Sequence, residues 1–124
     1  MFGMDRYFDF DNQVMTGASA RTFVFHAQIL TNYMGGIQFV DGGSYSDSGV
    51  FGLGWGYSGN SLFYHFYYND NSNWIELNPG EYILTFVYDG SVLTVYNGES
   101  LLGSYTTTLA TGTESKYRIG NYVI

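Results

Sequence analysis

Two dipeptides in the second half of the chain, Asp89-Gly90 and Asn97-Gly98, constrain its fold more than any other feature. Each stands between short runs in which apolar and polar residues alternate, within the segment from Glu81 to Ser100. Asp-Gly and Asn-Gly tolerate the positive φ angles that the tight turns of β-hairpins require. The segment therefore predicts three antiparallel strands that follow one another along the chain.

The rest of the 124-residue chain has the same character, because its apolar residues alternate with a period of two and form no long amphipathic helix. The clearest strand runs from Arg21 to Leu30, with Phe23, Phe25, Ala27 and Ile29 on its apolar side and Thr22, Val24, His26 and Gln28 opposite. The other expected strands cover residues 6–10, 37–40, 50–55, 61–68, 74–77, 82–88, 92–96, 101–107, 117–119 and 122–124. Residues 41–49 are expected to form a polar loop.

The composition also favours an all-β fold over a helical one. Aromatic residues make up 20% of the chain and charged residues only 12%, and there are 17 glycines to form turns. The length suits one core. We therefore expect a single domain, residues 1–124, that folds as an antiparallel two-sheet β-sandwich or jelly roll.

The charge balance excludes some classes of partner. The net charge is −7, and the chain has only four Lys and Arg residues with which to contact phosphates, so we expect no nucleic-acid partner.

No segment is apolar over a length that would span a bilayer. The absence of cysteine excludes disulfides and thiolate metal sites.

Several motifs in the second half are similar to those of concanavalin A-like, laminin-G-like jelly-roll domains. These motifs are Trp74, Tyr88-Asp89-Gly90, Leu93-Thr94-Val95-Tyr96, Asn97-Gly98 and Arg118-Ile119-Gly120. The resemblance implies the jelly-roll fold and a role in recognition or structure. Members of that family continue into a strand that closes the sheet beside the N-terminal strand. Because this sequence stops at Ile124, we expect that strand to be missing and a sheet edge to be open to another chain.

The acidic residues do not predict an enzyme. Hydrolysis of glycosides with retention needs two carboxylates about 5–5.5 Å apart, which on a strand means acids two or four positions apart. Related hydrolases carry Glu-x-Asp-x-Glu in a strand, and no such triplet occurs here. The two histidines, His26 and His65, lack the further nitrogen or sulfur ligands of a zinc site. We expect them to be solvated or partly buried strand residues.

Calcium is the metal that the acidic loops favour, since it takes carboxylate and carbonyl oxygens. The resemblance implies such a site at the rim of a sandwich, and Asp41, Asp47 and Asp70 are its candidate ligands. The alternative is that each aspartate forms a turn with its own backbone.

Aromatic residues are the other candidates for ligand binding, because tyrosine and tryptophan rings stack on the apolar faces of sugars. The candidates are Trp55, Tyr57, Tyr64, Tyr67 and Trp74. The alternative is that these rings fill the core or contacts between chains.

Two functions follow from these observations. The first is a non-enzymatic structural subunit, a homo-oligomer or polymer, that self-assembles through a sheet edge and its termini into an extracellular fibre or virion appendage. The low charge favours it. Its expected contact residues are Tyr7, Phe8, Tyr122, Val123 and Ile124.

The second function is a lectin-like adhesion module that binds glycan or protein, with or without calcium. Residues 1–5 carry no secretory signal pattern, and the expected location is extracellular, at a cell surface or on a virion.

Overall fold

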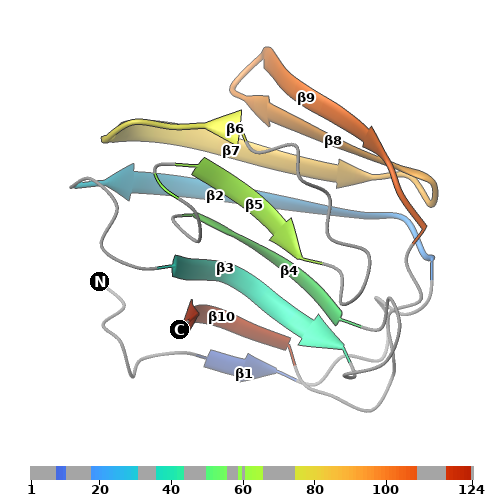
Figure 1. The fold of residues 1–124 in the computed structure, drawn as a ribbon. Helices are drawn as coiled ribbons and strands as arrows, with labels where there is room; N and C mark the ends of the chain where they lie inside the picture. Colours follow the sequence, from blue (N-terminus) through green and yellow to red (C-terminus); the bar gives the residue numbers. More distant parts are fainter. Residues whose placement is uncertain are drawn as a thin grey trace.

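A computed structural model describes the backbone of residues 8–10, 18–30, 36–43, 50–55, 59, 61–65, 75–108 and 117–123. Side chains are described for residues 18–30, 53–54, 59, 61–62 and 75–108. Throughout these ranges the regular elements are β-strands, and they form two antiparallel sheets (Figure 1). The predicted all-β class is therefore confirmed.

The first sheet has six strands in the order β1-β10-β3-β4-β5-β6, and the second has four in the order β2-β7-β8-β9. The strands of the six-stranded sheet are β1 (Phe8–Phe10), β10 (Tyr117–Val123), β3 (Gly36–Gly43), β4 (Val50–Trp55), β5 (Ser61–His65) and β6 (Ile75–Glu76). Those of the four-stranded sheet are β2 (Arg21–Ile29), β7 (Gly80–Tyr88), β8 (Val92–Asn97) and β9 (Ser100–Thr106).

The alternation along β2 has the predicted orientation. Phe23, Phe25 and Ala27 are half-buried and pack against the core, whereas Val24 and His26 are exposed. The strand pairs with β7 over nine residues. Such a long ladder forms because the period-two pattern of both strands puts apolar residues on the same face.

Both predicted hairpins are present, and their turns differ in position. The β7–β8 turn has Gly90 at φ 111°, next to Asp89, as predicted. In the β8–β9 turn Asn97 is the last strand residue and pairs with Ser100, so the turn residues are Gly98, at φ 55°, and Glu99. Glycine occupies the positive-φ position in each turn because other residues are strained there.

Side chains from both sheets meet in one hydrophobic cluster. Its buried members are Ile29, Leu53, Leu62, Leu77, Leu84, Phe86, Tyr88, Leu93 and Val95. Burying one such side chain contributes about 1.5–3 kcal/mol, so this cluster is a major favourable term that offsets the conformational entropy lost on folding.

Three expectations differ from the structure. β3 continues through Asp41 to Gly43, so the first three residues of the expected loop belong to a strand. The two short strands expected after residue 116 are one strand, β10. Finally, β10 lies between β1 and β3, so a strand of this chain occupies one side of the N-terminal strand, and the other side of β1 is an edge of the described sheet. The backbones of Phe8, Tyr122 and Val123, which we expected to contact another chain, pair within this one.

Candidate interaction surface

The two aromatic candidates in the described strands lie close together in the six-stranded sheet. Trp55, at the end of β4, is opposite Leu62 of β5, and Tyr64 of β5 is opposite Leu53 of β4. Leu53 and Leu62 are both buried. These aromatic residues therefore share register positions with core residues, and sugar binding by them stays a prediction.

Among the calcium candidates, Asp41 lies within β3, opposite Arg118 of β10 and Gly52 of β4. The remaining candidates lie outside the described residues: Tyr57, Tyr67, Trp74, Asp47, Asp70, Tyr7 and Ile124. Within the described part of the chain no group of three or more His, Asp or Glu side chains is placed to hold a metal. Calcium binding thus stays a prediction.

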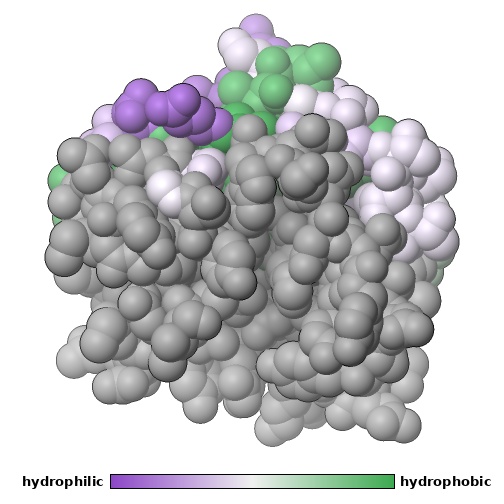
Figure 2. Space-filling view, in the orientation of Figure 1, coloured by the Kyte–Doolittle hydropathy of each residue, from purple (hydrophilic) through white to green (hydrophobic). Residues whose placement is uncertain are grey.

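The surface that the structure describes most fully is the side of the four-stranded sheet that faces away from the core. We call it the outer face. Its members, taken from the register, are Thr22, Val24, His26, Gln28, Glu81, Ile83, Thr85, Val87, Val92, Thr94, Tyr96, Leu101, Ser104 and Thr106. Hydrophobic side chains reach the surface over this sheet, at the top of the view in Figure 2.

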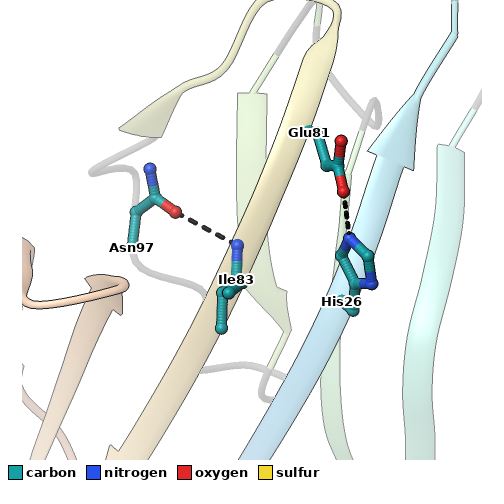
Figure 3. Close-up of polar contacts among 4 residues, drawn as sticks. All are labelled: His26, Glu81, Ile83 and Asn97. Carbon is teal, nitrogen blue, oxygen red and sulfur yellow. Dashed lines mark hydrogen bonds and ion pairs between the residues drawn. The ribbon is translucent and has the colours of Figure 1, made fainter.

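One ion pair lies on the outer face. Nε2 of His26 on β2 is 2.6 Å from Oε1 of Glu81 on β7 (Figure 3). Both side chains are 67% exposed, as expected for solvated strand residues. Water screens such an exposed pair, so it contributes little to stability. It does neutralise the acidic residue of the outer face when the histidine is protonated.

Four apolar side chains occupy neighbouring outer-face positions, one on each of the four strands. Val24 lies diagonally from Ile83, and Ile83 diagonally from Tyr96, which is directly opposite Leu101. Diagonal neighbours on a sheet are about 7–8 Å apart, within reach of large side chains. Val24 is 63% exposed, Ile83 54% and Leu101 61%, whereas Tyr96 is half-buried. We refer to these four residues as the apolar path.

A β-bulge in β9 puts Leu101 on the outer face. Val95 pairs with Gly103 and Tyr96 pairs with Leu101, which leaves Leu102 as the extra residue. Leu102 packs against the core, so its neighbour Leu101 points the other way, into water. Without the bulge, strict alternation would put Leu101 on the same side as Gly103, toward the core.

Asn97 and Gly98 hold the middle of the apolar path by its backbone. The amide of Ile83 donates to Oδ1 of Asn97 at 3.1 Å, and the carbonyl of Ile83 accepts from the amide of Gly98 at 2.8 Å (Figure 3). Both backbone groups of Ile83 are thereby satisfied at the point where the regular β7–β8 ladder ends. The Asn-Gly dipeptide thus has a role beyond the turn, since its asparagine side chain extends the ladder.

A cluster of polar contacts lies at the other end of the four-stranded sheet, around Tyr88 at the end of β7. The buried hydroxyl of Tyr88 donates to the carbonyl of Gly90 at 2.8 Å and lies 3.3 Å from the carbonyl of Thr107. The guanidinium of Arg21, also buried, lies 5.7 Å from the centre of the Tyr88 ring, within the range of a cation–π contact. These contacts tie the first hairpin turn to the end of β9.

The carboxylate of Asp89 shapes that turn. Its Oδ1 accepts from the amides of Val92 at 2.7 Å and Ser91 at 2.8 Å, and these hydrogen bonds lower the pKa of Asp89 below its ordinary value of 3.8. Elsewhere in the sheet, partial burial raises the pKa of the Tyr105 hydroxyl. Both shifts belong to structural contacts, and neither group faces a described cleft.

Comparison of the chain with protein-family models, curated proteins and solved structures finds no match. Among the residues that the structure describes, no helix has the length and apolar character to cross a membrane. Any function proposed for the chain therefore has to come from the geometry of the outer face.

The sequence contained part of the signal for this surface. The exposed side of β2, with Val24 and His26, was predicted from the alternation. Ile83 and Leu101 were missed as surface residues. An apolar residue in a strand is ordinarily taken to face the core, and the position of the bulge is not readable from residue types.

Proposed function

We propose that this protein is a non-enzymatic structural subunit that associates with copies of itself, as part of an extracellular fibre or a virion appendage. The observation that carries the proposal is the outer face, a sheet surface that holds the apolar path and few charges. Charged residues make up roughly a quarter to a third of a well-behaved protein surface. Here Glu81 is the one carboxylate among the outer-face residues, and it is paired with His26.

The proposal includes a jelly-roll sandwich as the scaffold. Two antiparallel sheets that share a core, together with the Tyr88-Asp89-Gly90 and Asn97-Gly98 motifs, support that arrangement. In such a scaffold the outer face of a sheet is open to water unless something covers it. The expected contact through the N-terminal segment stays part of the proposal, because β1 pairs with β10 on one side and lies at the end of the described sheet.

Sedimentation velocity of the full chain, over a wide range of concentration, tests the proposal. We expect the weight-average sedimentation coefficient to rise with concentration, as reversible self-association requires. A chain that stays monomeric at millimolar concentration would refute it. Binding of the monomer to a glycan array, with or without calcium, would instead support the lectin-like alternative.

A further inference from the structure

We infer that the partner of the outer face is the same face of a second copy of this chain, so that two copies form a two-fold symmetric dimer. This inference rests on the proposed function and gives that function a defined contact. It is carried by two features of the outer face, its charge and the arrangement of the apolar path, and the area of the face sets the strength of the contact.

Charge favours a second copy that approaches through this face. The chain has a net charge of −7, so two copies repel each other over most orientations. The described residues of the outer face include one carboxylate, that of Glu81, and His26 lies against it. Two copies that meet face to face therefore bring few like charges together.

The apolar path is complementary to itself under a two-fold rotation. An axis parallel to the strands, between β7 and β8, places β2 of one copy over β9 of the other. Val24 then lies over the second copy's Leu101, and Ile83 lies near the second copy's Tyr96. Aligned packing of two sheets about 10 Å apart is the usual geometry of stacked β-sheets. Each residue of the apolar path thus meets an apolar partner.

The area predicts that this contact is weak. Strands about 4.8 Å apart, with outer-face residues every ~6.8 Å along each strand, assign ~33 Å² to each position. The 14 outer-face positions then cover roughly 450 Å² per copy, or about 900 Å² in total. Stable interfaces bury about 1,200 Å² or more, so the dimer should form at high micromolar concentration or above.

Three substitutions to lysine test the inference. Ile83→Lys and Leu101→Lys put a charge into the centre and the end of the apolar path. Leu30→Lys is the matched control, since Leu30 is 67% exposed but follows the end of β2, beyond the last residue that pairs with β7. Because a two-fold contact contains each residue twice, we expect the first two variants to weaken dimerisation about ten- to a hundredfold. Leu30→Lys should leave it within about twofold.

A charge pair tests the geometry directly and does not depend on loss of association alone. In the proposed dimer Val24→Lys of one copy lies over Leu101→Glu of the other. A mixture of these two variants should therefore dimerise more strongly than either variant by itself, with the effect reduced at high salt.

The outcomes separate the two proposals. A wild-type chain that is monomeric at millimolar concentration overturns both. A wild-type chain that associates, while Ile83→Lys and Leu101→Lys associate equally well, overturns this inference and leaves the proposed function standing. Circular dichroism spectra and melting curves confirm that each variant is folded. If Ile83→Lys or Leu101→Lys is unstable, the mixture of Val24→Lys with Leu101→Glu decides the inference in its place.

Discussion

Removal of the Tyr88 hydroxyl should cost far more stability than removal of the Tyr82 hydroxyl. Both tyrosines belong to β7, and each donates to a nearby backbone carbonyl, Tyr88 to Gly90 at 2.8 Å and Tyr82 to Asn78 at 2.7 Å. They differ in exposure. The Tyr88 side chain is 1% exposed, whereas the Tyr82 hydroxyl lies at the surface.

The magnitude follows from that difference. In Tyr88→Phe water cannot replace the lost donor, so a net hydrogen bond worth about 0.5–1.5 kcal/mol is lost and a carbonyl is left poorly satisfied. We expect a loss of roughly 1.5–2.5 kcal/mol in the free energy of unfolding. In Tyr82→Phe water takes over the carbonyl of Asn78, and the loss should be about 0.5 kcal/mol or less.

Thermal and urea unfolding of the two variants measure this difference. An unfolding entropy near 2.1 cal/mol/K per residue gives a 124-residue chain about 0.26 kcal/mol/K, so each kcal/mol shifts Tm by about 4 °C. Tyr88→Phe should lower Tm by roughly 6–10 °C and Tyr82→Phe by about 2 °C or less. Equal shifts in the two variants would refute the assignment of Tyr88 as the buried tie between the turn and β9.

Substitutions at three further positions test other local contacts. Asn97→Ala should lower the free energy of unfolding by about 0.5–1 kcal/mol in urea titrations, because the Ile83 amide loses its acceptor, whereas Asn97→Asp keeps an acceptor and should lose less. Because the pKa of Asp89 is lower in the folded chain than its ordinary value of 3.8, the ionised carboxylate stabilises the fold at pH values above 3.8, and this contribution is lost as the pH falls through the folded-state pKa. The free energy of unfolding, measured across acid pH, should therefore fall less steeply in Asp89→Asn than in the wild-type chain. An unchanged slope would contradict this. A methyl group at Gly103 would lie 2.8 Å from Cζ of Tyr105, so Gly103→Ala should displace that ring, cost about 1–3 kcal/mol and broaden the Tyr105 signals in NMR spectra.

The amino-acid pattern predicted the strands that carry clear alternation and the turns that need glycine. β2, β4 and the β7–β8–β9 series agree with expectation within one or two residues. These segments are locally determined, because period two and positive φ are properties of a few adjacent residues.

The differences arise where pairing over long distances decides the structure. Asp41 to Gly43 read as a loop, since aspartate and glycine have low strand propensity, but β4 pairs with all three residues and β10 pairs with Asp41. Gly120-Asn121 read as a break and lies within β10, and Asn121 pairs with Gln38. Likewise, the exposure of Leu101 depends on a bulge that the register with β8 creates.

The symmetry of the proposed contact limits what it can build. A two-fold contact uses the same surface on both copies and therefore closes after two chains, so growth into a fibre needs a second and different surface. Of the strands at the ends of the two described sheets, β1 contains Asp9, β2 contains Arg21 and His26, β6 contains Glu76, and β9 contains no charged residue. Charges on an edge strand discourage pairing with another chain, which makes β9 the least protected of the four.

The bulge at Leu102 opposes pairing at β9, because it bends the strand and leaves the four residues Gly103–Thr106 as its straight part. Edge pairing over so few residues adds only a small number of hydrogen bonds, so it should follow dimerisation and not precede it. Sedimentation profiles distinguish the two cases. A distribution that stops at the dimer shows that the outer face acts alone. Continued growth that Ile83→Lys, a change in the inner strand β7, abolishes and Leu30→Lys does not shows that the dimer is the unit that polymerises.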